Sequence, residues 1–488
     1  MGARTGAEFL VGLRDRRREL WLGGGKVDDI TGHPQLQAGA LTLASVFDRQ
    51  HEYAADCLVP NPETGEPMAI SHMIPRSVDD LRRRRRGLER IAEATVGLMG
   101  RTPDYMNVTF AGFAADPTFW CGPDRRNERG WCNLVAYQQL IAGDDLSLTH
   151  TIVHPTIDRA TDRNFTGGGI PLHKVGDTPN GIVVRGARIL ATLAPYADEI
   201  AVYPGTPQPP GTDPGYCLSF AVPADAPGMT YLCRDTVATV GTNAFDHPLS
   251  SRFDEQDAYV IFDDVEVPRE RVFIDGDMDV YNTVMGPSAW WPNIMQQTTT
   301  RALVKLEFAY GLACRLAEAV NDTQPGTIDM LGELASYVDV TRTAIDHAED
   351  RAYERGDGAW FPDGRPLHPM RSLLTTWFPR VREIIVMIGS HNLLATPSRA
   401  MLDNESLRPL IDEMLPGALG MSAEDRSALH RLAWDFVGSG MSGRNDLYER
   451  NYLGSGKLNR GHLHSVYHID RSREFGLVEA MLHVGRTI

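Results

Sequence analysis

Two kinds of hydrophobic periodicity divide the chain into three parts. From residue 5 to about 146, apolar residues recur mainly at the spacing of three or four that is typical of amphipathic helices. Between about 147 and 272, short β-branched and aromatic runs replace this spacing, and clusters of Gly, Pro and Asp separate them. Helical spacing returns after residue 295 in four long runs, at about 297–320, 327–350, 372–396 and 422–438.

This order predicts an α+β architecture that is mostly α. We expect an N-terminal helical domain over residues 1–146, a middle β-barrel or sandwich over 147–272 and a C-terminal helical bundle over 273–488. The four long runs of the last part are the helices of that bundle. A short strand is also predicted at Glu19–Leu22, inside the otherwise helical first part.

The composition is that of a globular protein, since 42% of the 488 residues are hydrophobic and 23% are charged. The net charge of −16 argues against a nucleic-acid partner, which would need a basic face. No apolar run approaches about 18 residues, so we expect no membrane span, and no apolar signal segment precedes the first helical pattern. Six scattered cysteines indicate reduced thiols and a cytoplasmic protein.

The stretch from Gly100 to Tyr105 has the pattern of a helix start. Thr102 suits the N-cap, Pro103 suits the first helical position, and Asp104 adds a negative charge to the first turn. Arg101 and Tyr105 can therefore converge near the positive end of a helix, a place that favours a phenolate or a carboxylate. The alternative is an ordinary capped helix with an exposed arginine and a packed tyrosine.

Four further motifs each allow an ordinary and a functional interpretation. The run 82–86 is five arginines, which predicts a solvated helix face or, alternatively, a docking site for an acidic partner. The stretch 438–443 matches G-x-G-x-x-G but follows a helical run, so it predicts a glycine-rich helix end or, alternatively, a place where backbone N–H groups approach a phosphate or a flavin ring. His464 and His468 lack a third ligand and are interpreted as surface histidines, so no metal is expected. His150 lies where helices give way to strands and is either an acid–base candidate or a structural histidine.

Several stretches together resemble the flavin-dependent, two-component aromatic hydroxylases, a family typified by the oxygenase component of 4-hydroxyphenylacetate 3-monooxygenase. The resemblance extends over nearly the whole chain, and the order and spacing of its stretches are specific. They are TG (5–6), LRD (13–15), GKVDDITGHP (25–34), RTPDY (101–105), TH (149–150), PTIDR (155–159), GARILAT (186–192), PLSSRFDE (248–255) and GRNDLYE (443–449).

The resemblance implies an acyl-CoA dehydrogenase-like fold with a helical domain, a β-barrel and a C-terminal four-helix bundle, usually in a homotetramer. It also implies FAD, used as FADH2 that a separate NAD(P)H:flavin reductase supplies by diffusion, together with O2. A nicotinamide-binding fingerprint is therefore not needed in this chain.

By position, the resemblance implies that Arg101, Tyr105 and His150 surround the hydroxyl group of a phenolic substrate. Gly205 and Thr206 would hold the far end of that substrate. The implied flavin contacts are His150, Thr156, Ile157, Asp158, Arg159, Thr192, Gly440, Met441, Ser442 and Gly443. The loop around Gly205 is unusually rich in proline, and the segment between Tyr105 and His150 is longer than usual, so the sequence leaves the substrate tail open.

The reaction implied is hydroxylation of a phenol ortho to its hydroxyl group. Reduced flavin and O2 would form a C4a-hydroperoxide, which is a weak electrophile, so the ring must be made electron-rich by loss of the phenol proton. We expect His150 to accept or hydrogen-bond that proton, Arg101 to stabilise the phenolate, and Tyr105 to donate to the same oxygen.

Three alternatives stay open at the level of sequence. A natural-product tailoring hydroxylase would act on a tyrosine-like phenol tethered to a carrier protein, which the proline-rich loop and the arginine run 82–86 motivate. An acyl-CoA dehydrogenase-type flavoenzyme would need a catalytic carboxylate and a retained flavin, and a dehydratase of this fold would need closely spaced cysteines for an iron–sulfur cluster. A non-catalytic binding module would have no use for Arg101, Tyr105 and His150.

Overall fold

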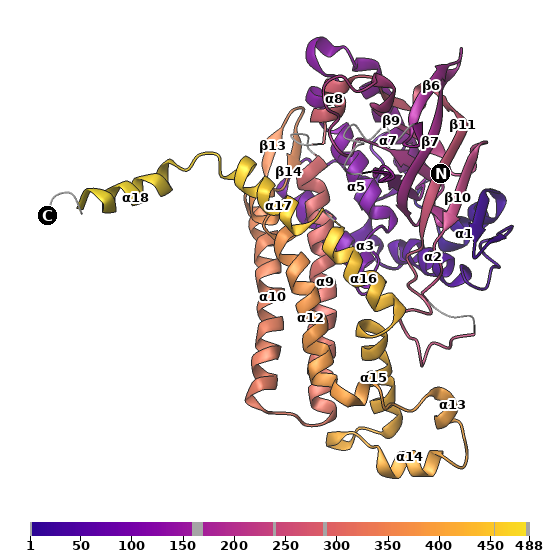
Figure 1. Ribbon diagram of the computed structural model, residues 1–488, viewed down its shortest axis with the longest axis vertical. Coiled ribbons are helices and arrows are strands. Elements are labelled where there is room, and N and C mark those ends of the chain that lie inside the picture. Colours follow the sequence, from indigo (N-terminus) through magenta and orange to yellow (C-terminus); the bar gives the residue numbers. More distant parts are fainter. Residues whose placement is uncertain (1, 159–168, 238–240, 286–289, 453, 485–488) are drawn as a thin grey trace.

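Long helices packed side by side lie next to the two larger β-sheets, and shorter helices from the N-terminal part lie between and around them (Figure 1). This computed structural model describes residues 2–158, 169–237, 241–285, 290–452 and 454–484. The mostly helical α+β class predicted from the sequence is the class observed. Among the described residues, no helix has both the length and the apolar character that crossing a lipid bilayer requires.

The first part of the chain is mainly helical. Its helices are α1 (Gly6–Asp15), α2 (Gln37–Glu52), α3 (Ala54–Cys57), α4 (Val78–Glu93), α5 (Pro103–Ala114), α6 (Pro117–Trp120) and α7 (Glu128–Gly143). Helix α1 begins with a capping box, in which Thr5 and Glu8 satisfy each other's backbone N–H groups. Helix α5 is central to the fold, because every residue from Pro103 to Phe113 is buried.

Two larger sheets make up most of the β part, and β3 (Leu58–Pro60) pairs with β4 (Pro67–Ala69) in a separate two-stranded sheet. The six-stranded sheet has the order β2-β1-β10-β11-β7-β6 and the four-stranded sheet the order β12-β9-β8-β5. Their strands are β1 (Glu19–Leu22), β2 (Gly25–Lys26), β5 (Leu148–Thr151), β6 (His173–Asp177), β7 (Gly181–Thr192), β8 (Glu199–Val202), β9 (Leu218–Pro223), β10 (Met229–Cys233), β11 (Asp257–Pro268) and β12 (Val272–Asp275). Their facing sides share one apolar core, which includes Ile182, Phe220 and Phe262.

The predicted strand at Glu19–Leu22 is confirmed, but its partner lies far away in the sequence. Strand β1 pairs in parallel with β10, with Leu20 opposite Tyr231. The six-stranded sheet therefore contains strands from both sides of residue 146. The division of the chain into three domains at residues 146 and 272 stays a prediction.

The four long helices predicted for the C-terminal part are present as α9 (Trp290–Ala319), α10 (Pro325–Asp350), α12 (Met370–Gly389) and α15 (Ala423–Val437). They share an apolar core that runs along the bundle. Helix α12 ends at Gly389, earlier than the predicted run 372–396. Ser390 adopts a positive φ of 49°, which is incompatible with a continuing right-handed helix. The shorter elements of this part are β13 (Tyr353–Arg355), β14 (Ala359–Phe361), α8 (Met278–Thr283), α11 (Gly364–Leu367), α13 (Arg399–Leu402) and α14 (Arg408–Met414).

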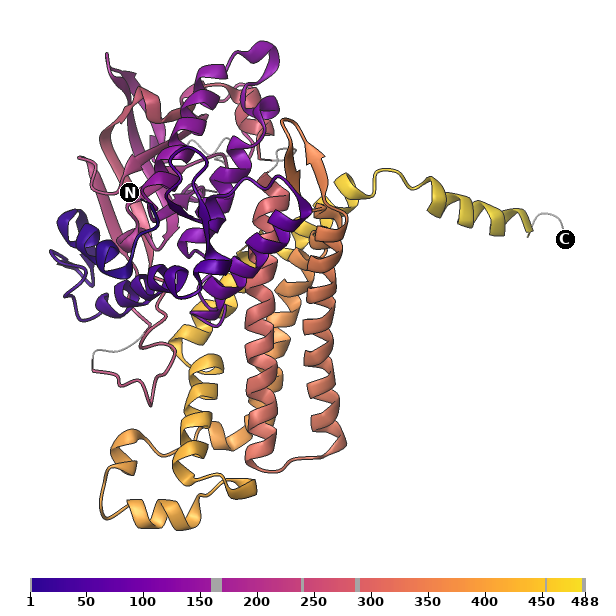
Figure 2. The ribbon, with the colours of Figure 1, turned by 180° about the vertical axis from the view of Figure 1, so that it is seen from behind.

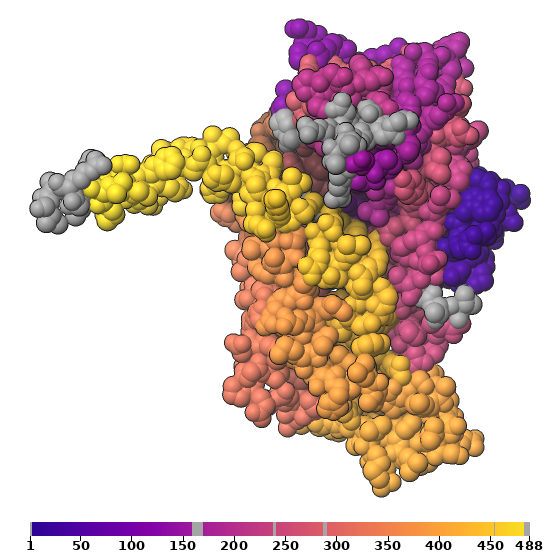
Figure 3. Space-filling view, viewed as in Figure 1, coloured from indigo at the N-terminus to yellow at the C-terminus, as the bar shows by residue number. Residues whose placement is uncertain are grey.

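Three helices end the described chain: α16 (Gly440–Asn451), α17 (Gly456–His462) and α18 (Ser472–Val484). Helix α16 brings the C-terminal part against Arg101, as described below. Helix α18 leaves the body as a narrow arm, which both ribbon views and the space-filling view show (Figures 1, 2 and 3). Its apolar side chains, such as Phe475, Val478 and Met481, are exposed.

The arginine run 82–86 in α4 joins the first part of the chain to the bundle. Arg84 is fully buried and donates to the side chains of Asn293 and Gln296 in α9. Arg85 forms an ion pair with Glu349 of α10 at 3.0 Å. The prediction of a solvated face holds for Arg86 but is wrong for Arg84, because a helix with arginine on every side must turn some of them inward.

Candidate active site

Helix α5 begins at Pro103 as predicted, but its first turn is stabilised differently. Thr102 occupies the N-cap position without a side-chain cap bond. The buried Asp104 carboxylate instead interacts with the Thr102 hydroxyl and accepts a 2.9 Å hydrogen bond from Gln297 Nε2 in α9. Burial raises the pKa of Asp104 to about 6. The start of α5 is thus fixed to the bundle, and this fixes the residues on both sides of it.

Arg101 is buried among aromatic rings and is not an idle surface residue. Its guanidinium carbon lies 3.8 Å from the ring centroid of Tyr105 and 4.2 Å from that of Tyr452. Nη2 donates to the Tyr452 carbonyl at 3.3 Å, whereas Nη1 is buried and has no hydrogen-bond partner among the described residues. A buried donor without a partner is costly, so Nη1 is available for an acceptor that a ligand brings.

His150 meets Arg101 and Tyr105 across the boundary between helices and strands. It lies on β5, and its ring is stacked between Tyr105 and Tyr203, with centroid distances of 5.4 and 5.1 Å. Its Nδ1 has no hydrogen-bond partner within the part of the chain that the structure describes. Burial first, and the positive charge of Arg101 second, lower the pKa of His150 well below its usual range. At neutral pH the imidazole is therefore uncharged and can accept a proton or a hydrogen bond.

The structure thus brings the three predicted phenol-binding residues together and adds three tyrosines that the sequence interpretation missed. Tyr203 covers the second face of His150, Tyr452 covers Arg101, and Tyr448 packs on Tyr452 with 4.6 Å between ring centroids. Tyr448 and Tyr452 are four residues apart and so fall on one side of a helix, a signal that the sequence does contain.

Thr192, one of the predicted flavin contacts, is close to the same corner. Its carbonyl accepts a hydrogen bond from the hydroxyl of Thr149, the residue before His150. Its own hydroxyl donates to Asp257 Oδ1 at 2.7 Å. Thr192 is therefore held beside β5, and its hydroxyl oxygen keeps a lone pair for a ligand.

The other predicted flavin contacts on this side form an exposed stretch. Thr156, Ile157 and Asp158 follow β5 after a short connection and have exposed side chains. Arg159 lies outside the described residues. Buried His154, just before this stretch, has a pKa of about 3, because burial and the nearby Arg188 guanidinium disfavour its charged form.

The predicted glycine-rich turn, Gly440 to Gly443, is the first turn of α16. Ser439 caps it by accepting from the backbone N–H of Ser442. Helix α15 ends with Gly438 at its C-cap, as the helix-end interpretation predicts, but residues 440–443 begin a new helix instead of ending one. Tyr452 lies at the other end of α16, roughly 18 Å along the axis. The structure does not bring Gly440, Met441, Ser442 and Gly443 into contact with Arg101, Tyr105 and His150.

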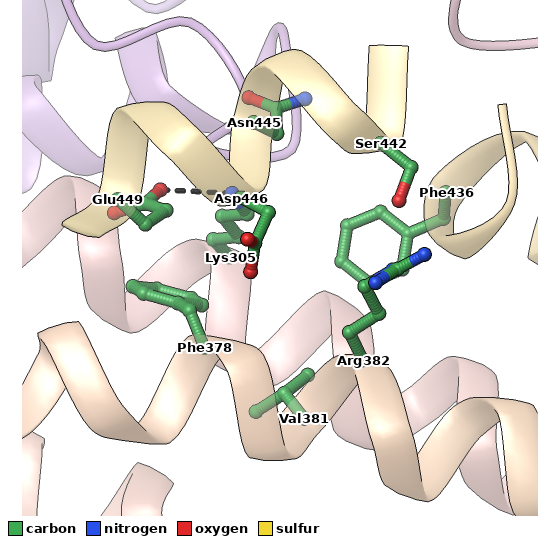
Figure 4. A pocket seen from close by; sticks show the side chains of 9 residues that line it. All are labelled: Lys305, Phe378, Val381, Arg382, Phe436, Ser442, Asn445, Asp446 and Glu449. Atoms are coloured by element: carbon green, nitrogen blue, oxygen red, sulfur yellow. Dashed lines mark hydrogen bonds and ion pairs between the residues drawn. The ribbon is translucent and has the colours of Figure 1, made fainter. Parts of the chain in front are cut away.

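A small cavity adjoins this turn (Figure 4). Its volume is about 30 Å³, and its lining includes Lys305, Phe378, Ser442, Asn445 and Glu449. Ser442 Oγ and Asn445 Oδ1 are buried without a hydrogen-bond partner among the described residues. This volume suits one or two water molecules and is far too small for a flavin ring.

The loop predicted to hold the far end of a substrate is anchored at Gly205. Its backbone N–H donates to the Tyr281 hydroxyl at 3.4 Å, and a Cβ at this position would lie only 2.5 Å from the Ile152 carbonyl oxygen. Only glycine therefore allows the loop to lie this close to the chain that leaves β5. Thr206 is exposed. Buried Arg188 donates to the same Ile152 carbonyl at 2.7 Å, so the loop, β7 and the end of β5 are held together.

No group of three His, Cys, Asp or Glu side chains that could hold a metal ion occurs among the described residues. His464 and His468 are both exposed, as the surface interpretation predicted.

Comparison with known proteins identifies the family. The model of the 4-hydroxyphenylacetate 3-hydroxylase N-terminal region matches residues 5–274, and that of the C-terminal region matches residues 282–482. The chain therefore belongs to the 4-hydroxyphenylacetate 3-hydroxylase family, which confirms the resemblance seen in the sequence.

Two relatives of similar sequence identity carry names with different substrates. The chain is 35% identical, over 97% of its length and 96% of the relative's, to the 4-hydroxyphenylacetate 3-monooxygenase oxygenase component of Thermus thermophilus. It is 32% identical, over 92% of its length and 85% of the relative's, to a (3S)-3-amino-3-(3-chloro-4-hydroxyphenyl)propanoyl-[peptidyl-carrier protein SgcC2] monooxygenase of Streptomyces globisporus.

Solved structures agree. A 4-hydroxyphenylacetate 3-monooxygenase oxygenase component complexed with FAD and 4-hydroxyphenylacetate superposes with a TM-score of 0.92 at 34% identity, covering 99% of both chains. A glutaryl-coenzyme A dehydrogenase shares the fold alone, with a TM-score of 0.50 at 13% identity over 81% of this chain and 84% of that one. The predicted acyl-CoA dehydrogenase-like fold is thus confirmed.

Proposed function

We propose that this chain is the oxygenase component of a two-component, FADH2-dependent monooxygenase that hydroxylates a phenolic substrate ortho to its hydroxyl group. The observation that carries the proposal is the buried corner of Arg101, Tyr105 and His150, in which Arg101 Nη1 and His150 Nδ1 have no hydrogen-bond partner among the described residues. The relatives named as monooxygenase components support the same conclusion.

The corner is suited to binding a phenol as its phenolate. An opposite charge within about 4–6 Å lowers an acid's pKa by about 1–3, so Arg101 favours loss of the phenol proton. Neutral His150 accepts a hydrogen bond from the phenol hydroxyl and so assists loss of its proton, and the Tyr105 ring, stacked on His150, fixes the orientation of the aromatic substrate. Removal of the proton makes the ring electron-rich at its ortho position, and general-base help of this kind is typically worth about 10²–10⁴-fold.

The residues present fit a flavin beside this corner. Reduced flavin, when bound, supplies with O2 the electrophilic oxygen atom. Thr192, and the exposed stretch from Thr156 to Asp158, are the described residues that would hold it, since they flank β5 next to His150. The buried rings of Tyr105 and Tyr203 keep water from this place, which limits release of hydrogen peroxide without product.

The activity should not depend on the ordinary titration of histidine. Because the pKa of His150 lies well below about 6.5, the imidazole stays neutral as the pH falls through that value. We therefore expect the yield of hydroxylated product per O2 to be constant between about pH 6 and pH 8. The stability of the fold, in contrast, does depend on pH in this range. Because the pKa of His150 is lowered in the folded state, the neutral imidazole contributes stability above about pH 6.5, and this contribution is lost as the pH falls toward the folded-state pKa.

Product analysis at fixed reduced flavin between pH 6 and pH 8 checks this expectation. A midpoint near pH 6.5 in the product yield would contradict the neutral-base role of His150.

The substrate tail distinguishes two versions of the proposal. A free acid such as 4-hydroxyphenylacetate fits the relative from Thermus thermophilus, whereas a carrier-tethered, tyrosine-like phenol fits the relative from Streptomyces globisporus. The arginine run does not favour the second version as a docking site, because Arg84 donates to Gln296 and Arg85 pairs with Glu349 within this chain. Turnover of 4-hydroxyphenylacetate, tyrosine, 4-nitrophenol and a carrier-linked aryl thioester under one set of conditions decides between the two.

The partners follow from the same proposal. We expect a separate NAD(P)H:flavin reductase, a cytoplasmic location and a homotetramer. The apolar, exposed side chains of α18 support association between copies, since an isolated helix of 13 residues is marginal in water. Light scattering of the full chain, compared with a chain that ends at residue 468, measures this contribution.

A flavoenzyme of the acyl-CoA dehydrogenase type is the competing proposal. It would purify with bound yellow flavin and would be reduced by an acyl-CoA. The oxygenase component is expected to purify colourless and to bind reduced flavin added to it.

A further inference from the structure

A buried glutamate, Glu255, holds the backbone just before α5. Glu255 lies two residues before β11, and its side chain is 1% exposed. Its Oε1 accepts hydrogen bonds from the backbone N–H groups of Gly100 and Arg101, both at 2.7 Å. A single carboxylate oxygen therefore fixes the peptide from which the Arg101 side chain departs.

The second oxygen of Glu255 connects this peptide to the predicted flavin side. Oε2 accepts from Arg444 Nη1 at 2.6 Å, and Arg444 also donates to Asp257 through Nη2 at 2.9 Å and Nε at 3.1 Å. Asp257 accepts from the Thr192 hydroxyl at 2.7 Å. A continuous chain of hydrogen bonds thus runs from Thr192 to the backbone of Arg101.

Two tyrosines of the C-terminal part restrain the same peptide from the other side. The Tyr452 hydroxyl donates to the Gly100 carbonyl at 3.0 Å. A Cβ at Gly100 would lie 2.2 Å from the Tyr448 hydroxyl oxygen, so residue 100 has to be glycine for the peptide to lie here. The peptide is thus enclosed by groups from two distant parts of the sequence, Glu255 on one side and Tyr448 and Tyr452 on the other.

We propose that Glu255 is the positioning residue of the phenol site, and that Arg444 and Asp257 link it to Thr192 so that the phenol and the flavin are held in one register. This inference rests on the proposed function. Among the described residues, the Arg101 guanidinium makes one hydrogen bond to protein, so the direction of the side chain depends on where its backbone lies. A displacement of about 1 Å at a catalytic group can cost roughly 10²-fold in rate.

The position of the carboxylate oxygen can be separated from its charge by two conservative variants. Glu255→Asp keeps the charge but withdraws the acceptor by about one methylene. Glu255→Gln keeps the length and an acceptor oxygen for both backbone N–H groups, but it removes the charge and turns an amide NH2 toward the Arg444 donor, so it breaks the link to Arg444 while the peptide of Arg101 stays held. Glu199 provides a matched control, because it is also buried and paired with an arginine, Arg271, at 2.5 Å, and does not contact the peptide of Arg101. The control variants are Glu199→Asp and Glu199→Gln.

Two readouts report on Arg101 and not merely on stability. The first is the visible absorbance of enzyme-bound 4-nitrophenol against pH, which gives the acidity of a bound phenol without any turnover. The second is the fraction of consumed O2 recovered as hydroxylated product rather than hydrogen peroxide, measured with FADH2.

We expect Glu255→Asp to make the bound phenol about tenfold less acidic, to raise the KM for phenol about tenfold and to send most of the O2 to hydrogen peroxide. Glu255→Gln is expected to stay within about threefold of the wild type in acidity and KM, and both Glu199 variants are expected to match the wild type. The positioning role is overturned if Glu255→Asp behaves as the wild type, or if Glu255→Gln is impaired as much as Glu255→Asp. A wild type that hydroxylates no phenol refutes the proposed function instead, while the acidity of bound 4-nitrophenol still tests Glu255.

Discussion

Replacement of Arg101 or His150 by alanine is expected to separate oxygen consumption from hydroxylation. Arg101→Ala removes the guanidinium that lies against both the Tyr105 and the Tyr452 rings, and His150→Ala removes the neutral base between Tyr105 and Tyr203. The phenol then stays protonated, and its ring stays less electron-rich than that of the phenolate. Product formation should fall by about 10²–10⁴-fold, while FADH2 and O2 are still consumed and hydrogen peroxide is released.

Matched controls are available in the same chain. Arg18 is a buried arginine that donates to the carbonyls of Pro195 and Ala197, both at 2.8 Å, and His430 is a buried histidine of α15. Arg18→Ala and His430→Ala should lower stability without changing the ratio of product to peroxide. Oxygen-electrode traces combined with chromatography of the products measure that ratio. Unimpaired hydroxylation in both Arg101→Ala and His150→Ala would contradict the roles assigned to them.

Replacement of Glu449 by alanine is expected to have the largest effect on stability. Glu449 pairs with Arg301 at 2.5 Å and with Lys305 at 2.8 Å, and all three side chains are at most 4% exposed (Figure 4 shows the Lys305 pair). The two cations hold the pKa of Glu449 at about 2 against the effect of burial. Without Glu449 both cations are buried without this partner, and breaking a buried pair in this way costs about 3–5 kcal/mol.

Denaturant unfolding of Glu449→Ala against Glu318→Ala measures this cost. Glu318 forms an exposed pair with Arg315 on α9, for which the expected cost is about 0–1 kcal/mol. Similar free energies of unfolding for the two variants would show that the buried network contributes no more than a surface pair. The pH dependence has a defined sign, because a depressed carboxylate pKa contributes stability above about pH 4.5 that is lost as the pH falls toward about 2.

The large elements of the fold could be predicted because their patterns are local. Four helical runs gave α9, α10, α12 and α15, and the start of α5 followed from Pro103 and the residues around it. The pairing of β1 with β10 could not be predicted, since hydrogen bonds between strands that are distant in sequence leave no periodic signal. Burial of Arg84 was missed for a similar reason: its amide partners in α9 belong to another helix.

The candidate site was predictable only in part. Arg101, Tyr105 and His150 came from family motifs, and the structure places them in contact. Tyr203 directly follows β8, and its stacking on His150 depends on how β8 pairs with β5, which the sequence does not state. Glu255 lay within a recognised motif, but its role as an acceptor for the backbone of Arg101 is visible only when three parts of the chain come together.

Hydroxylation by the purified chain with reduced flavin from outside tests the central claim most directly. Colourless protein would be mixed anaerobically with FADH2 and 4-hydroxyphenylacetate, then exposed to oxygen-18 gas, and the products examined by mass spectrometry. The account predicts an ortho-dihydroxylated product that carries one oxygen-18 atom, and only hydrogen peroxide from the Arg101→Ala variant. Product oxygen that comes from water, or flavin that is retained and reduced by an acyl-CoA, would contradict it.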